Sequence, residues 1–236
     1  MAIPNDKAIL RSLVDGSLTE ITDENVPGVT VISQSYIFAH YPGLTKVELN
    51  DLTTLGEYTF YYCPDLQTVN LPEATTIGSS AFRGCRSMKS LYLPKVTTLG
   101  AYAMTYVAPE YVREMVLVLP KLTTLSGRSV FDRSYFLAVD IGPGLSALTA
   151  DAFYHNTGIQ TVGTLILRNP TSVVTAASTG AINGLRSVYV PSALISGYQT
   201  ATNWSTYYGN GTITFSAIEG SEYEFYYADG TPIPTT

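Results

Sequence analysis

Apolar residues on either side of a single outward position recur along the chain, at first every 22 residues. This alternation predicts a short β-strand with one inward face. Proline follows many of these strands and is expected to end them, because it has no N–H to donate to a ladder. A Thr-Thr-Leu-Gly or Thr-Thr-Ile-Gly run then predicts a second short β-like or irregular segment. The apolar pairs are Val47 and Leu49, Val69 and Leu71, Leu91 and Leu93, Leu117 and Leu119, Val139 and Ile141, Leu165 and Leu167, and Val188 and Val190.

The same period governs the chain between the strands. Residues 60–81 and 82–103 are two copies of one pattern, each opening on a phenylalanine. A repeat of 20–50 residues is typical of a solenoid, in which each coil packs on its neighbours. We therefore expect a β-rich repeat solenoid with short parallel strands, one per coil of about 22 residues. The anchor positions that open each copy are Phe38, Phe60, Phe82 and Met104, followed at longer or unequal intervals by Phe131, Phe153 and Ile182.

The two ends of the chain depart from the repeat. Residues 1–35 include a short predicted helix and a degenerate capping repeat. Residues 36–191 are interpreted as the solenoid, and residues 192–208 as a capping helix. Residues 209–236 hold two alternating runs and a Pro/Thr tail, which predict a small hairpin or a linker.

The composition excludes some partners. The chain has 236 residues, 45% of them apolar, and 13 Lys and Arg against 19 Asp and Glu, which gives a net charge of −6. Binding to nucleic acid needs clustered cations, so nucleic acid is not expected as a partner. No stretch approaches the roughly 18 apolar residues of a membrane span, so membrane insertion is not expected either.

Residues with catalytic or metal-binding chemistry are few. His40 and His155 have no partner at metal spacing, so no metal or cofactor is expected. No nucleophile elbow or phosphate-binding loop is present, and the chain is not expected to be an enzyme. Cys63 and Cys85 occupy equivalent positions and are interpreted as small buried apolar residues, with a disulfide between stacked coils left open.

One motif carries a resemblance to a known family. The pattern L-x-x-V-x-L-P-x-x-x-T-x-I-G-x-x-A-F-x-x-C, over about residues 36–191, resembles the BspA-type leucine-rich repeat of bacterial cell-surface proteins. Residues 188–207 are similar to the closing segment of that family. The resemblance implies a leucine-rich-repeat solenoid and a binding or adhesion protein, extracellular or at the cell surface.

Two further expectations concern location and structure. Charges interrupt the N-terminal region where a secretion signal needs an apolar run, so a phage or prophage structural component, located in the virion, is the alternative. The resemblance also gives a role to the position three residues after each anchor, which holds Tyr41, Cys63, Cys85, Val107, Ser134 and Asn156 in successive copies. Its polar atoms are expected to satisfy turn backbone that the neighbouring coil does not reach.

The expected binding residues lie on the strands. Each strand carries one outward residue between two inward apolar ones, and stacking should align these outward residues into one face. Its mixture of rings, small apolar groups and acids favours a protein or glycan as partner. Tyrosines around the anchors are expected either to form a second aromatic surface or only to cover the coil edges. The expected binding column is Glu48, Asn70, Tyr92, Val118, Asp140, Ile166 and Tyr189.

Overall fold

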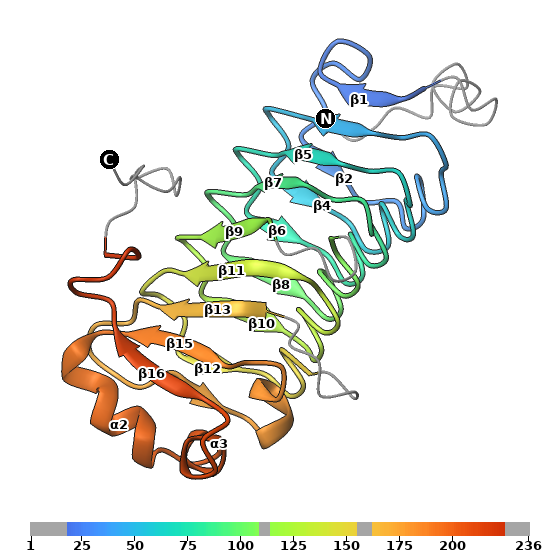
Figure 1. Cartoon of the computed structure of the whole chain (residues 1–236). Coiled ribbons are helices and arrows are strands. Elements are labelled where there is room, and N and C mark those ends of the chain that lie inside the picture. The colour runs from blue at the N-terminus through green and yellow to red at the C-terminus, as the bar shows by residue number, and fades with distance from the viewer. Residues whose placement is uncertain (1–17, 109–113, 155–161, 225–236) are drawn as a thin grey trace.

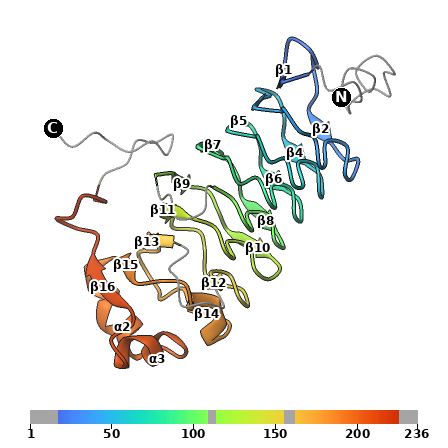
Figure 2. The ribbon, with the colours of Figure 1, turned by 45° about the vertical axis from the view of Figure 1, so that its right-hand side comes forward.

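A computed structural model describes residues 18–108, 114–154 and 162–224. The chain winds into about eight coils, which stack in chain order from one end of the molecule to the other (Figure 1, Figure 2). All strand pairs in the described part are parallel, as expected when each coil repeats the path of the one before it. The fold is therefore the predicted repeat solenoid. The helix expected within residues 1–35, at residues 5–15, lies outside the described residues.

One side of the solenoid, which we call the strand face, is formed by nine strands. They are β1 (Glu20–Thr22), β3 (Lys46–Glu48), β5 (Thr68–Asn70), β7 (Ser90–Tyr92), β9 (Val116–Leu119), β11 (Phe136–Ile141), β13 (Val162–Leu167), β15 (Ser187–Val190) and β16 (Thr214–Ala217). They form two parallel sheets, ordered β1-β3-β5-β7 and β16-β15-β13-β11-β9. The break between β7 and β9 coincides with the lengthening of the anchor interval from 22 to 27 residues, whereas β8 (Thr98–Gly100) and β10 (Thr124–Ser126) remain paired across the same coils.

A second set of strands corrects the expectation of one strand per coil. These strands are β2 (Val31–Ile32), β4 (Thr54–Leu55), β6 (Thr76–Ile77), β8 (Thr98–Gly100), β10 (Thr124–Ser126), β12 (Ala147–Leu148) and β14 (Thr175–Ala176). They form one sheet ordered β10-β8-β6-β4-β2 and a separate β12-β14 pair. Threonine hydroxyls reinforce this side, since Thr75 Oγ1 donates to the Thr53 carbonyl and Thr97 Oγ1 to the Thr75 carbonyl, each at 3.2 Å.

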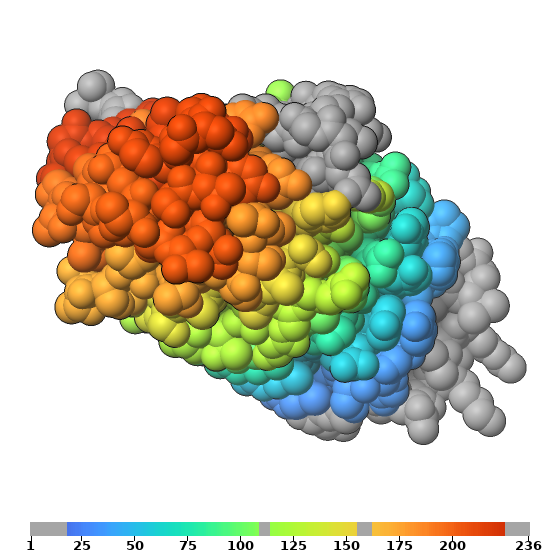
Figure 3. Space-filling model, turned by 90° about the horizontal axis from the view of Figure 1, so that it is seen from below, coloured from blue at the N-terminus to red at the C-terminus, as the bar shows by residue number. Residues whose placement is uncertain are grey.

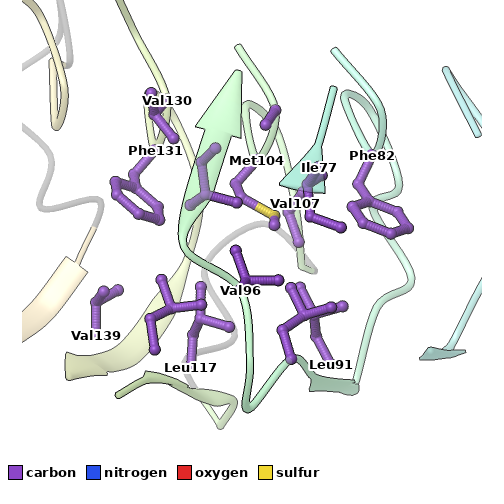
Figure 4. Close-up of a cluster of buried hydrophobic side chains, with 14 of the residues drawn as sticks. Ile77, Phe82, Leu91, Val96, Met104, Val107, Leu117, Val130, Phe131 and Val139 are labelled. Carbon is purple, nitrogen blue, oxygen red and sulfur yellow. The ribbon is translucent and has the colours of Figure 1, made fainter. Parts of the chain in front are cut away.

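The anchor side chains form the centre of the core. Phe38 and Phe60 stack with ring centroids 5.3 Å apart, and Phe60 and Phe82 with centroids 5.8 Å apart. Met104 then lies between Phe82 and Phe131 (Figure 4), where its flexible thioether fills the wider gap of the longer coil. These anchors are buried, so the aromatic column is part of the continuous apolar core.

The turns around the anchors have an unusual backbone. The described residues two before and two after each anchor from Phe38 to Phe153 have positive φ, a conformation that residues other than glycine adopt only at some cost. Gly180, two before the anchor Ile182, does not share it. The described residues in this conformation are Tyr36, His40, Tyr58, Tyr62, Ser80, Gly84, Tyr102, Tyr106, Ser129, Arg133 and Asp151.

This backbone allows the turns to bond from coil to coil. Left-handed residues on both sides of the anchor let alternate N–H groups point toward the following coil. Tyr58 N donates to the Ser79 carbonyl at 2.9 Å and Phe60 N to the Ala81 carbonyl at 2.9 Å. Tyr62 N donates to the Arg83 carbonyl at 2.7 Å, and the same pattern recurs in later coils. We call this series of bonds the turn ladder.

The position after the turn completes the bonding. Cys63 Sγ donates to the Phe38 carbonyl at 3.0 Å, and Cys85 Sγ donates to the Phe60 carbonyl at 3.1 Å. Ser134 Oγ bonds the Met104 carbonyl in the same way. The expected structural role of this position is therefore confirmed for these residues, whereas Asn156 lies outside the described ranges. Both cysteines are free thiols, and burial raises the pKa of Cys63 to about 12, which keeps it protonated as a donor.

The C-terminal end is closed by helical turns. They are η1 (Thr179–Ile182), η2 (Ser192–Leu194), α2 (Ile195–Thr200) and α3 (Trp204–Gly209). The buried Trp204 Nε1 donates to the Val174 carbonyl at 2.8 Å, and Val174 N donates to Tyr198 Oη at 2.9 Å. Figure 3 shows this end of the chain, orange to red, gathered at one end of the stack. The single predicted capping helix is thus two short helices joined at residues 201–203.

The chain returns to the sheet after the cap. Strand β16 pairs in parallel with β15, with Val188 opposite Phe215 and Tyr189 opposite Ser216. The hairpin or linker expected from residue 209 is therefore wrong for these residues, which extend the strand face by one strand. A parallel partner is possible because the two capping helices carry the chain back to the starting edge.

Substitution of Cys85 should separate its hydrogen bond from its volume. Cys85→Ala leaves the buried Phe60 carbonyl without this donor, and we expect a loss of about 1–3 kcal/mol in the free energy of unfolding. Cys85→Ser keeps a donor of the kind that Ser134 supplies and should lose less. Urea unfolding would measure both variants, and an equal loss would show that the bond contributes nothing.

Candidate binding surface on the strand face

The structure aligns the expected binding column in two runs. Glu48 is opposite Asn70, and Asn70 is opposite Tyr92. In the second sheet Val118 is opposite Asp140, and the column continues to Ile166 and Tyr189. The alternation in the sequence therefore gave the register of every member. The two runs differ in what covers them.

The first run is open. A shallow depression of ≈ 410 Å³ lies over β3, β5 and β7 and is lined by Lys46, Glu48, Thr68, Val69, Asn70, Ser90 and Tyr92. Lys46 Nζ and Glu48 Oε2 are 2.6 Å apart, which lowers the pKa of Glu48 and raises that of Lys46. Since both groups are largely exposed, this pair adds little to stability and leaves both charges at the rim.

The amide of Asn70 is the unusual group in this depression. Its Oδ1 is buried and has no hydrogen-bond partner among the described residues. A buried acceptor without a partner costs free energy that a donor from a ligand or a water molecule would recover. The depression thus combines an ion pair, an acceptor with no protein donor, and the half-exposed ring of Tyr92.

The second run is covered, which corrects its expected exposure. Asp140 is 1% exposed and Ile166 is not exposed at all. Ile218 packs on Ile166 and Ala138, and Tyr189 and Tyr223 pack against the same cluster. We call residues 218–224 the covering segment. The covering segment lies over β11, β13 and β15, on the face where a partner was expected to bind.

An ion pair fastens the covering segment to the strand face. Arg168 Nε and Nη2 donate to the Asp140 carboxylate at 2.8 Å and 2.9 Å. Arg168 Nη2 also donates to the Tyr223 carbonyl at 2.6 Å. The bidentate geometry is the strong form of this interaction, and it is largely shielded from water here. Asp140 is therefore a structural residue in this conformation.

The covering segment was missed from the sequence although one signal pointed to it. The second run is apolar at outward positions, with Val116, Val118 and Ile166 where the first run has Lys46, Glu48 and Asn70. An outward face of this composition normally packs against something. The repeat period does not identify the segment that covers this outward face, because residues 218–224 lie beyond the last repeat.

Metal-binding groups do not gather on the described part of this face. Over the described ranges, no three His, Cys, Asp or Glu residues are close enough to hold a metal ion. Within the same ranges, no helix is long and apolar enough to cross a membrane. The geometry offers recognition groups on a ladder of strands.

Stacked coils with two short strands, an aromatic anchor and a Cys or Ser donor define a leucine-rich-repeat solenoid. The family model of the BspA type leucine rich repeat region matches residues 16–109 in six copies. The match confirms repeats of the BspA type within residues 16–109, which are less than half of the chain. A search of functionally curated proteins found no match.

Two solved structures resemble the chain at low identity. A leucine-rich repeat protein from Bacteroides ovatus is 16% identical with a TM-score of 0.47, over 87% of this chain and 62% of that protein. A leucine rich cell surface protein from Faecalibacterium prausnitzii is 13% identical with a TM-score of 0.33, over 92% of this chain and 82% of that protein. The chain thus spans less than two thirds of the Bacteroides protein.

Asp140→Asn should release the covering segment. The substitution leaves the shielded guanidinium of Arg168 without its carboxylate, and loss of one partner of such a pair costs about 3 kcal/mol or more. Limited proteolysis should then cleave within residues 218–224 faster than in the wild type. Glu73→Gln, which removes the exposed pair with Lys95, is the control and should change neither stability nor cleavage. Equal cleavage of all three proteins would contradict the assignment.

Proposed function

We propose that this protein is a non-catalytic binding protein of a bacterial surface, and that the open run of the strand face contacts a partner protein. The observation that carries the proposal is the buried Oδ1 of Asn70, which has no donor in the described structure. A rotation of the Asn70 side chain would turn this atom toward the depression, where a backbone N–H of an extended segment lying across β3, β5 and β7 would supply a donor. The location is proposed because the BspA-type repeat is typical of bacterial cell-surface proteins.

The chemistry of the depression supports a protein partner. Glu48 and Lys46 offer both signs of charge at its rim, and Tyr92 offers a ring with a polar tip. Aromatic anchors surrounded by polar groups are typical of protein interfaces. The covering segment, which lies over the second run as a short stretch of peptide, shows that this face accommodates polypeptide.

The proposed face has narrower limits than the expected column. Glu48, Asn70 and Tyr92 form its open part, whereas Asp140 and Ile166 are excluded by their burial. Tyr189 contacts Tyr223 of the covering segment, and both Val118 and Tyr189 keep part of their surface exposed. The comparisons lend no support to a phage or prophage structural role.

Tyr92→Ser tests the proposed face. We expect affinity for a partner protein, found by screening immobilised extracellular proteins with the purified chain, to fall about tenfold or more. Tyr208→Ser is the control, because Tyr208 is an exposed ring, at 40%, on α3 of the cap. Asn70→Ala should also weaken binding while keeping the melting transition. Unchanged affinity for both strand-face variants would rule out this face.

A further inference from the structure

A second surface lies on the turns, away from the strand face. Rings of neighbouring coils contact each other there: Tyr36 stacks on Tyr58 with centroids 4.4 Å apart, and His40 stacks on Tyr62 at 5.6 Å. Tyr61 meets Tyr36, His40, Tyr58 and Tyr62 edge to face. We call the tyrosine edge the group Tyr36, His40, Tyr58, Tyr61, Tyr62, Tyr102 and Tyr106. Tyr36 is 52% exposed, and the others keep part of their surface in water.

The fold does not require these rings. Five of the tyrosines occupy left-handed positions of the turns, where glycine or asparagine is easier to accommodate. Equivalent positions in other coils hold Ser80, Gly84 and Ser129, with the turn ladder intact. The core is complete beneath them, because the anchors fill it. The tyrosines therefore form an additional surface, although five of them have a strained, left-handed backbone conformation.

Arginines join the tyrosine edge on its later coils. The guanidinium of Arg83 lies over the rings of Tyr61 and Tyr102, at 5.9 Å and 5.2 Å from their centroids. Arg128 lies over Tyr102 at 5.9 Å, and Arg86 over Tyr106 at 5.0 Å. A guanidinium stacked on a ring keeps the N–H groups of its rim directed outward.

These arginines form no close ion pair with a described residue, although Arg83 lies within electrostatic reach of one carboxylate: burial raises the pKa of Asp132, and the charges of Arg133 and Arg83 lower it. In the described ranges no carboxylate lies within ion-pair distance of Arg83, Arg86 or Arg128. Arg133 is the exception: it lies 3.9 Å from Asp132 and donates to Tyr106 Oη. The Nε of Arg83 is buried without a hydrogen-bond partner. An acidic protein thus presents a row of cations on one edge.

The rings determine what kind of anion fits. Because they stack on each other along the coils, they present edges and phenol hydroxyls, which both donate and accept hydrogen bonds. A ligand with many hydroxyls and a planar anion uses both the phenols and the guanidinium forks. The coils are about 4.8 Å apart, comparable to the length of one sugar ring. Nucleic acid fits less well, since neighbouring rings already occupy ring faces on which bases would stack.

From this arrangement we propose that the tyrosine edge, with Arg83, Arg86 and Arg128, binds a carboxylate-bearing polysaccharide lying along the coil axis, about one sugar per coil. The hydroxyls of the sugar bond the phenols, and its carboxylates pair with the guanidinium groups. This surface is separate from the strand face, so each can fail without the other.

The test uses the purified chain with polygalacturonate, alginate and hyaluronan. Methyl-esterified polygalacturonate is the matched ligand, because it has the same backbone without the charge. Tyr102→Asn combined with Tyr106→Asn removes two rings at left-handed positions that asparagine tolerates, so the melting transition should not fall. Arg83→Gln is a second variant that keeps the ring set. Tyr92→Ser on the strand face is the control.

We expect at least one acidic polysaccharide to bind, with about tenfold or greater weakening in both tyrosine-edge variants and on esterification. Binding should also weaken as salt is raised, and the Tyr92→Ser variant should bind as the wild type does. Failure to bind any of the three polymers would overturn the proposal. So would wild-type affinity in both variants, equal binding of the esterified polymer, or tighter binding of a single-stranded oligonucleotide.

Discussion

The turn ladder is the interaction on which the rest of the structure depends. Coils that merely packed apolar side chains would slide against each other, whereas Tyr58, Phe60 and Tyr62 each donate a backbone hydrogen bond to the next coil and fix its position. That bonding needs left-handed residues on both sides of the anchor, so the backbone geometry of the turn limits which residues these positions accommodate. Both sets of strands and the stacked anchors inherit their register from it.

The sequence predicted the coil well because each coil repeats the same physical problem. Alternation predicted β3, β5 and β7 with the correct inward residues, and the column after the anchors predicted the donors Cys63 and Cys85. The second strand of each coil was only partly foreseen, since the two or three residues of strands such as β6 give too short a pattern. β16 was read as part of a hairpin or linker because nothing local distinguishes a parallel partner from an antiparallel one.

The sequence predicted which residues of the candidate site lie opposite one another on the strands, but not which of them are exposed to solvent. The pattern aligned Asn70 with Tyr92 correctly, since a strand position follows from its neighbours. It could not show that Asp140 is covered, since that depends on Arg168 and Tyr223, which are 28 and 83 residues away along the chain. The apolar character of Val118 and Ile166 was the available signal that something covers them. Only the fold identifies the covering segment, residues 218–224.

The direction of the turn ladder gives the turn side of the solenoid a polarity. Alternate N–H groups of each turn donate to the coil that follows, so the peptide dipoles of the turns add along the axis as they do in a helix. Other bonds, such as that from Thr75 N to the Thr53 carbonyl, run from the later coil to the earlier one. The turns therefore offer donors at one end of the stack and acceptors at the other, and an exposed row of such groups can recruit another chain as a strand edge does. The helices α2 and α3 lie at the donor end of the turns.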